Sequence, residues 1–214
     1  FWTDHTYQVQ TWGGFPPASK MSIISILKRA SRCEDGTAHG DGSMQLWLVG
    51  PFGPTRDETL DIFPAKSPNA PVLLFVHGGY WRILSSKEFS LVARGPVAHD
   101  VTVVVSNYSL CPKVSLAEIT RQSRATVAWI ANNITRYNGD PSRLFVAGHS
   151  AGGHLAAMLL TCRWEQVAPD LPTDLLRSAI SISGLFELEP IRHTPFLAPD
   201  QIGRASCRER VSSP

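Results

Sequence analysis

The sequence predicts an α/β fold with a doubly wound, mostly parallel sheet. Four short runs at 71–76, 101–106, 143–148 and 179–184 are rich in apolar residues, as strands buried on both faces are. Segments with helix-start signals lie between these runs. The chain therefore alternates strand and helix, which is the order typical of a doubly wound sheet.

Two further strands precede the alternating part. The segments 44–49 and 59–63 alternate apolar and polar residues, and a stretch rich in glycine and proline, 50–58, joins them. We expect them to pair at an edge of the sheet.

The predicted helices have recognisable start signals. The segment 85–98 opens with Ser85 and Glu88 at capping-box spacing, and 115–134 opens with Ser115 and Glu118 in the same way. The second helix places four apolar residues on one face: Ile119, Val127, Ile130 and Ile134. A third helix, 151–162, directly follows the strand that ends at Gly148.

Composition limits the classes of function. The chain has 214 residues, 43% hydrophobic and 18% charged, which is typical of a globular domain. Its formal charge of +2 comes from residues 202–214, and the remainder is neutral. Because no basic cluster stands out, the sequence indicates neither a nucleic-acid partner nor an anionic membrane. A monomer and a homodimer both fit this composition.

The cysteines and the apolar runs indicate the compartment. The four cysteines do not form a C-x-x-C pair, and no His/Cys cluster has zinc spacing; they are Cys33, Cys111, Cys162 and Cys207. We interpret them as reduced thiols, with a single disulfide as the alternative. No apolar run is long enough to span a bilayer, and no signal peptide is evident. We therefore expect a cytoplasmic protein without a metal site.

Three regions follow from these patterns. Residues 1–43 are rich in Gly, Pro and small polar residues and are expected to be an irregular extension. Residues 44–201 form the α/β domain. Residues 202–214 have no apolar period, and "IGRASCRERV" corresponds to the translation of a common sequencing-adapter oligonucleotide. We therefore interpret 202–214 as a non-native tail.

A serine lies at the junction of a predicted strand and a predicted helix. Residues 148–152, "GHSAG", fit the G-x-S-x-G pattern of a nucleophile elbow. In such an elbow the serine occupies a sharp turn, so the residues two before and two after it need almost no side chain. The helix N-terminus also offers free N–H groups to a developing oxyanion. Ser150 is therefore the candidate nucleophile.

A second glycine pair follows the strand at 71–76. In "HGGYW", residues 77–81, the adjacent glycines let the backbone approach a ligand closely. We expect Gly78 or Gly79 to supply one oxyanion N–H and Ala151 the other. Tyr80 and Trp81 are expected to shape a pocket for aromatic groups, although both also suit core packing.

These motifs together resemble one branch of the α/β-hydrolases. "HGGYW", "NYSLCP", "GHSAGGHLAAMLL" and "SGLFELEPI" are similar to the kynurenine formamidase (arylformamidase) branch, and "GPTRDETLDIFP" fits it too. The resemblance covers about residues 44–201. It implies a sheet of the α/β-hydrolase type and hydrolysis of N-formyl-L-kynurenine to kynurenine and formate, without metal or organic cofactor.

The sequence shows no clear candidate for the histidine and the acid that would activate Ser150. In α/β-hydrolases the acid and then the histidine follow the serine, each after a later strand. Here one strand follows the elbow helix, so the sheet is expected to be incomplete at the C-terminus and to expose an apolar edge. His149 and His154 suit structural packing, and His193 lacks a preceding strand. The downstream acids are better explained as solvated surface residues; they are Asp170, Asp174, Glu187, Glu189 and Asp200.

The sequence therefore supports three readings of function. The first is a serine hydrolase of the arylformamidase type whose triad acid and histidine lie beyond this chain, which is then a largely inactive fragment. The second is a carboxylesterase acting on small esters. The third is a non-catalytic α/β-hydrolase scaffold that binds a ligand, against which the intact elbow argues.

Overall fold

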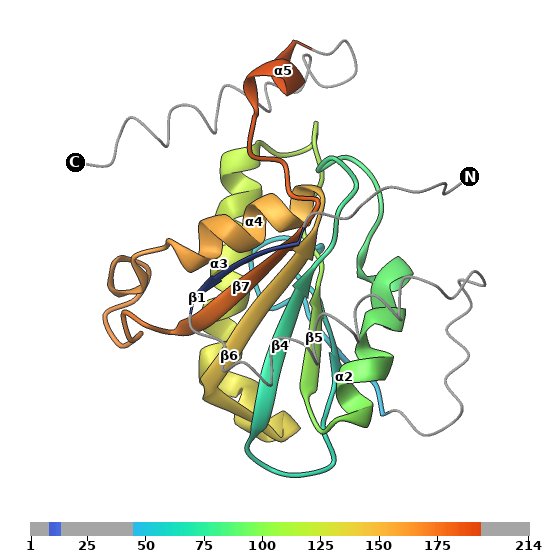
Figure 1. Cartoon of the computed structure of the whole chain (residues 1–214), viewed down its shortest axis with the longest axis vertical. Helices are drawn as coiled ribbons and strands as arrows, with labels where there is room; N and C mark the ends of the chain where they lie inside the picture. Colours follow the sequence, from blue (N-terminus) through green and yellow to red (C-terminus); the bar gives the residue numbers. More distant parts are fainter. Residues whose placement is uncertain (1–8, 14–44, 194–214) are drawn as a thin grey trace.

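The computed structural model describes residues 9–13 and 45–193. Within these ranges seven strands form one sheet in the order β1-β7-β6-β4-β5-β3-β2 (Figure 1). The strands are β1 (Val9–Gly13), β2 (Trp47–Val49), β3 (Leu60–Phe63), β4 (Ala70–Val76), β5 (Thr102–Ser106), β6 (Gly139–His149) and β7 (Leu176–Ile182).

The centre of the sheet is parallel and its edges are antiparallel. Strands β5, β4, β6 and β7 are parallel neighbours. Strand β3 pairs antiparallel with β5, and β2 pairs antiparallel with β3. This arrangement is that of an α/β-hydrolase and confirms the predicted fold class and the two early edge strands.

Helices cover both faces of the sheet (Figure 1). The α-helices are α2 (Arg94–Ala98), α3 (Leu116–Asn133), α4 (Ala151–Leu160) and α5 (Glu189–Arg192). The 3-10 helices are η1 (Ser86–Ala93), η2 (Ile134–Tyr137) and η3 (Trp164–Gln166). Helices α3 and α4 pack on one face, whereas η1 and α2 pack on the other.

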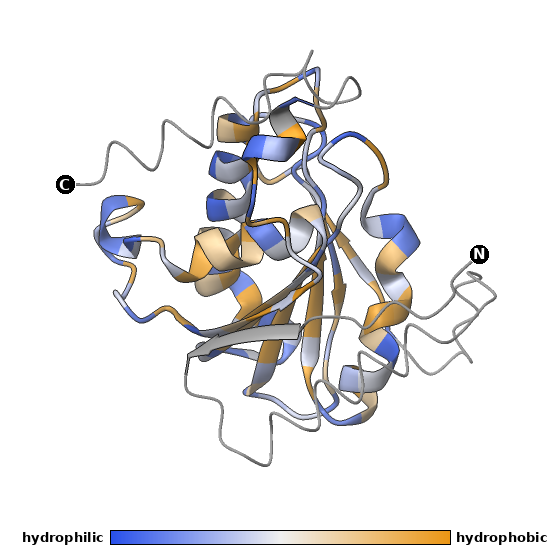
Figure 2. Ribbon diagram, turned by 45° about the horizontal axis from the view of Figure 1, so that its top comes forward, coloured by the Kyte–Doolittle hydropathy of each residue, from blue (hydrophilic) through white to orange (hydrophobic). Residues whose placement is uncertain are grey.

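Strand β4 shows how the sequence builds two cores. Val72, Leu74 and Val76 face the core shared with α3 and α4, whereas Leu73 and Phe75 face the core shared with η1 and α2. Successive side chains of a strand point to opposite faces, so a strand between two helical layers is apolar throughout. In Figure 2 the central strands are coloured largely as hydrophobic.

The predicted helix 85–98 is divided in the structure. Ser85 and Glu88 do form the predicted capping box. The helix that follows is a 3-10 helix to Ala93, and an α-helix continues to Ala98. Pro96 interrupts regular hydrogen bonding because its nitrogen carries no hydrogen.

In the predicted helix 115–134, both the N-terminal cap and the buried apolar face are observed. The Ser115 side chain accepts a hydrogen bond from the Glu118 backbone N–H. The Glu118 carboxylate instead accepts hydrogen bonds from the Arg121 guanidinium. The four apolar residues predicted to share a face are fully buried, with Ile134 placed in η2; they are Ile119, Val127, Ile130 and Ile134.

The edge of β7 differs from expectation. Within the region predicted to be irregular, Val9–Gly13 forms β1, which pairs antiparallel with β7 from Val9 opposite Ile182 to Gly13 opposite Ser178. The expected open edge at β7 is therefore occupied. Unpaired N–H and C=O groups at a sheet edge favour the addition of an extended segment, and periodicity did not identify so short a segment. The rest of 1–43 and the whole of 194–214, including the adapter-like tail, lie outside the described residues.

A charged cluster fastens the loop after β2 to helix α3. Glu58 is fully buried, and its carboxylate accepts hydrogen bonds from the Thr55 N–H at 2.8 Å and from the Arg121 guanidinium at 2.7 Å. Arg121 also bridges to Glu118 at 2.8 Å. A buried carboxylate needs such partners because its desolvation is costly. The cluster therefore fixes the 50–58 loop beside the start of α3.

No helix in the described ranges is both long enough and apolar enough to cross a membrane.

We predict that Arg121→Met lowers the free energy of unfolding by about 2 kcal/mol, because it leaves the buried Glu58 carboxylate without its cation. The control is Arg177→Met, which removes an exposed ion pair to Asp174 and a hydrogen bond to the Ser142 carbonyl and should cost about 1 kcal/mol or less. Urea denaturation of both variants measures the difference. Equal losses in the two variants would contradict the role given to Glu58.

Candidate active site

Ser150 lies on a strained turn between β6 and α4. Its backbone has φ 55° and ψ −118°, outside the regions that a serine ordinarily adopts. The backbone is held there because the Ser150 N–H donates to the Ile182 carbonyl at 2.8 Å and the His154 N–H donates to the Ser150 carbonyl at 3.2 Å. The side chain makes no capping hydrogen bond to α4 and is partly exposed. The turn thus presents the hydroxyl at the carboxyl end of the parallel strands.

Two glycines permit this turn by close packing. A Cβ atom added to Gly152 would lie 2.5 Å from the His77 carbonyl oxygen and still closer to that of Val76. A Cβ atom added to Gly148 would overlap the Gly152 carbonyl. Gly152 is needed because α4 begins directly against the end of β4, and Gly148 is needed because the first turn of α4 lies directly over it.

The loop after β4 lies against the serine. A Cβ atom added to Gly78 would be 3.2 Å from the Ser150 Cβ and 2.7 Å from the His149 carbonyl oxygen. Gly79 has φ +107°, a conformation that favours glycine, and a Cβ atom there would overlap the Ile83 carbonyl. The structure thus brings together the predicted residues Gly78, Gly79, Ser150 and Ala151.

Tyr80 and Trp81 are placed differently from one another. Both have positive φ, 52° and 59°. The Tyr80 side chain is 44% exposed, whereas Trp81 is fully buried and meets the His154 ring edge-on with 5.7 Å between ring centroids. Trp81 therefore packs in the core beneath the loop, and Tyr80 is exposed at the surface of the same loop.

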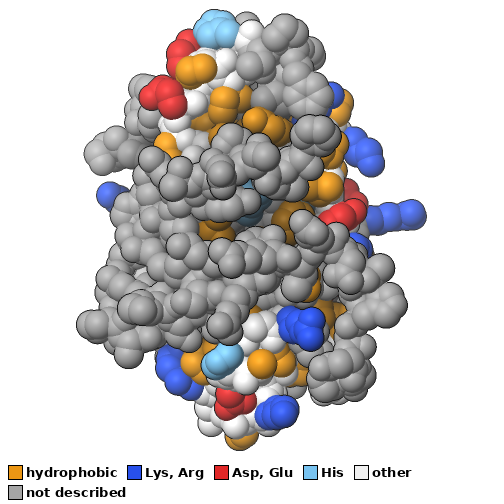
Figure 3. Space-filling view, turned by 45° about the vertical axis from the view of Figure 1, so that its right-hand side comes forward, with side chains coloured by type: hydrophobic (Ala, Val, Ile, Leu, Met, Phe, Trp, Pro, Cys, Tyr) orange, Lys and Arg blue, Asp and Glu red, His pale blue; other side chains and the backbone are white. Residues whose placement is uncertain are grey.

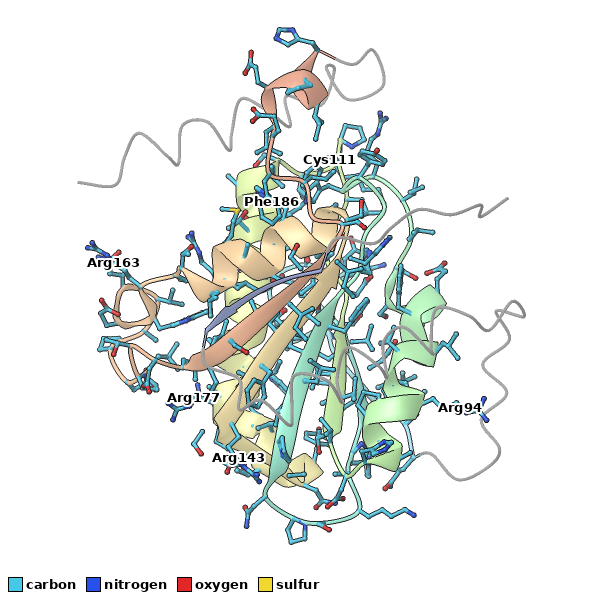
Figure 4. The ribbon with its side chains drawn as sticks, in the orientation of Figure 1. Arg94, Cys111, Arg143, Arg163, Arg177 and Phe186 are labelled. Atoms are coloured by element: carbon cyan, nitrogen blue, oxygen red, sulfur yellow. The ribbon has the colours of Figure 1, made fainter. Side chains whose placement is uncertain are left out.

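Further apolar side chains are exposed on the loops around this end of the sheet. They are Ile83 and Leu84 on the loop after β4 and Phe186 on the loop after β7. Figure 4 places Phe186 beside α4, and Cys111 at the same end of the molecule, whereas Arg143 and Arg177 lie toward the opposite end. In the space-filling view of Figure 3, hydrophobic side chains reach the surface at several places between charged ones. An apolar rim of this kind suits a substrate with an apolar part.

The histidines beside and after the serine do not complete a triad within the described residues. His154 Nδ1 lies 2.8 Å from the Leu185 carbonyl oxygen, and burial lowers the pKa of His149. His193 is exposed, with its Nε2 3.0 Å from Glu189 Oε1, beside helix α5, which projects beyond the sheet (Figure 1).

The downstream acids are also at the surface. Asp170, Asp174, Glu187 and Glu189 are exposed, and Asp200 lies outside the described residues. Across 45–193, no hydrogen bond joins the Ser150 hydroxyl to a histidine or a carboxylate. In the same ranges no group of three or more His, Cys, Asp or Glu side chains could hold a metal ion.

His77 is a part of the site that sequence reasoning did not single out. It is fully buried, and its Nδ1 lies 2.7 Å from the Gly78 carbonyl oxygen. Burial lowers its pKa to about 4, so the ring is neutral near pH 7 and Nδ1–H donates to that carbonyl. Its position directly before the two glycines was the signal that could have identified it.

Comparison with known proteins places this geometry in a family. The sequence profile of the BD-FAE family matches residues 60–175. The kynurenine formamidase of Salmo salar is 32% identical over 178 residues, which cover 82% of this chain and 58% of that protein. Carboxylesterase NlhH of Mycobacterium tuberculosis is 33% identical over 114 residues, which cover 53% of this chain and 36% of the esterase. The chain thus spans well under two thirds of the length of these curated relatives.

A solved structure shares the fold. The crystal structure of a candidate thioesterase from Silicibacter sp. TM1040 superposes with a TM-score of 0.66 and 26% sequence identity. The match covers 89% of this chain and 67% of that protein.

We predict that stability falls as the pH is lowered from about 6.5 to 4. In this range the unfolded chain binds a proton at His77 that the folded chain excludes, so acidification favours unfolding, by about 3 kcal/mol for the full shift. Urea denaturation at several pH values measures the slope. The control is His77→Asn, which keeps a side-chain N–H but does not titrate. If the variant kept the full slope, groups other than His77 would have to cause it.

We predict that Gly152→Ala destabilises the domain by about 2 kcal/mol or more, because the new methyl group meets the Val76 and His77 carbonyls. The matched control is Gly95→Ala in helix α2, where alanine is the better helix former and should be neutral or stabilising. Thermal and urea denaturation compare the two. A Gly152→Ala protein as stable as the wild type would show that α4 can move away from β4 at little cost.

Proposed function

Because the chain belongs to the BD-FAE family and has the α/β-hydrolase fold, we propose that Ser150 is the nucleophile of a serine hydrolase. The observation that carries the proposal is the strained elbow at the start of α4. There the Ser150 hydroxyl makes no capping hydrogen bond to the helix. A binding scaffold has no need of that strain, which costs on the order of 1–3 kcal/mol.

The reaction proceeds through an acyl-enzyme. The Ser150 oxygen attacks the substrate carbonyl carbon and its proton passes to a base. The bond to the leaving group then breaks, and the leaving nitrogen or oxygen receives that proton. Water next attacks the acyl-enzyme and releases the acid, which regenerates the serine. The base and the acid that orients it are residues outside those described here.

Backbone N–H groups stabilise the negative charge that develops on the carbonyl oxygen. Ala151 is the first residue of α4, so its N–H points out of the helix terminus. Gly78 lies against Ser150 from the other side, and Gly79 follows it in the same loop. Within the described residues, the N–H groups of Gly79 and Ala151 donate to no protein acceptor. Such groups are suited to an oxyanion.

N-formyl-L-kynurenine is the substrate that we favour, cleaved to kynurenine and formate. The similarity to kynurenine formamidases over 82% of this chain supports this choice. The exposed side chains of Tyr80 and Phe186 support it as well, because aromatic rings stack favourably on an aryl substrate. In this proposal Trp81 supports the loop from below.

A carboxylesterase is the second candidate, because 114 residues of this chain are 33% identical to carboxylesterase NlhH. Amide and ester substrates pass through the same tetrahedral geometry, so the site as described serves both. The ratio of kcat/KM for N-formyl-L-kynurenine to that for p-nitrophenyl acetate separates the two candidates. A preference for the ester of tenfold or more would favour the carboxylesterase.

We predict that Ser150→Ala in the full-length protein lowers kcat/KM by about 10⁴-fold or more and abolishes labelling by a fluorophosphonate probe. The matched control is Ser67→Ala, in an exposed turn between β3 and β4 at the opposite end of the sheet, which should keep full activity. Labelling of a residue other than Ser150, or unchanged activity in Ser150→Ala, would exclude this serine as the nucleophile.

A further inference from the structure

Tyr108 lies behind the loop that carries the two glycines. The residue is buried, and its hydroxyl donates to the His77 carbonyl oxygen at 2.8 Å. Its ring stacks on the His77 imidazole with 4.2 Å between ring centroids and 4° between planes. Burial raises the pKa of Tyr108, so the hydroxyl stays protonated and remains a donor. One side chain therefore holds both the carbonyl and the ring of His77.

His77 in turn holds the next peptide group. Its Nδ1–H donates to the Gly78 carbonyl oxygen at 2.7 Å. In a planar trans peptide the C=O and the following N–H point in opposite directions. Fixing the His77 carbonyl therefore fixes the Gly78 N–H, and fixing the Gly78 carbonyl fixes the Gly79 N–H.

The same chain segment also holds the far end of the loop. The Cys111 N–H donates to the Trp81 carbonyl oxygen at 2.8 Å. Residues 108 and 111 thus hold the first and last residues of "HGGYW". We call the segment 108–111 the loop brace.

The loop brace is itself anchored to the domain. The Ser109 N–H donates to the Gln122 side-chain oxygen on α3 at 2.8 Å, and the Ser109 hydroxyl donates to the Asp57 carboxylate at 3.0 Å. Because α3 is packed in the core and the Glu58–Arg121 ion pair fixes the 50–58 loop to it, both anchors of the brace are held in place.

We propose that Tyr108 is a positioning residue of the Ser150 site. By holding His77, it sets the direction of the Gly78 and Gly79 N–H groups that face the developing oxyanion. This inference rests on the proposed function of Ser150. It assigns to the Tyr108 hydroxyl an effect on the chemical step, because directed N–H groups matter most when the charge develops on the substrate oxygen.

The test is Tyr108→Phe in the full-length protein, which removes the hydroxyl and keeps the stacked ring. We expect kcat for p-nitrophenyl acetate to fall about tenfold or more, with KM within about twofold of the wild type. The inhibition constant of phenylboronic acid, which forms a tetrahedral adduct with an active serine, should rise by a similar factor. The control is Tyr137→Phe. Tyr137 is the last residue of η2, away from the loop, and its ring packs against Trp47 and Trp129. It should change neither quantity.

A second pair of variants keeps the test decisive if Tyr108→Phe folds poorly. His77→Asn retains a side-chain N–H for the Gly78 carbonyl, whereas His77→Leu has none. We expect kcat of the asparagine variant to be at least tenfold higher than that of the leucine variant. Circular dichroism checks that both variants are folded.

Two outcomes would overturn the assignment. One is an unchanged kcat in folded Tyr108→Phe, and the other is a change confined to KM. Ser150→Ala is assayed alongside, because activity that survives in that variant would refute the proposed nucleophile rather than the brace. If Ser150→Ala is inactive while Tyr108→Phe is fully active, the positioning role alone fails.

Discussion

The contact between the first turn of α4 and the end of β4 is the constraint on which the rest of the site depends. It requires Gly152 to sit against the Val76 and His77 carbonyls, where no side chain fits. Once that contact is made, Ser150 is forced to the top of the strand–helix turn with positive φ. The loop after β4 is brought against the same serine. The backbone strain at Ser150 is thus offset by the packing of α4 against β4 and of the loop after β4 against the serine.

The parallel sheet and the serine elbow could be predicted from sequence because their signals are local. The apolar runs of β4, β5, β6 and β7 identify a buried parallel sheet, and the glycines around Ser150 identify the elbow. The glycine-rich loop 77–81 was expected to supply an oxyanion N–H beside Ser150, because the loop after the corresponding strand does so in folds with a nucleophile elbow. The sequence left Tyr80 and Trp81 open between pocket and core, since an aromatic residue suits both. The structure resolves that ambiguity by burying Trp81 under the loop.

The parts that could not be predicted depend on contacts between distant residues. Tyr108 was seen within "NYSLCP", but nothing local shows that its hydroxyl reaches His77, 31 residues earlier in the chain. The same holds for Glu58 and Arg121, which are 63 residues apart. The break in the helix 85–98 has a more local cause: the capping box marks only where the helix begins, whereas Pro96, which has no backbone N–H, lies further along the same segment.

The pairing of β1 with β7 has a consequence for the order in which the protein assembles. Residues 9–13 are synthesised before the other described strands, yet their partner β7 is among the last to be made. The entropy lost in closing so long a loop is recovered only after the intervening sheet has formed. Among the described strands, β1 can therefore pair only after β7 has been made, although its own residues are synthesised first. Until it joins, β7 offers a bare hydrogen-bonding edge, and that interval is when the nascent domain is most exposed to pairing with another chain.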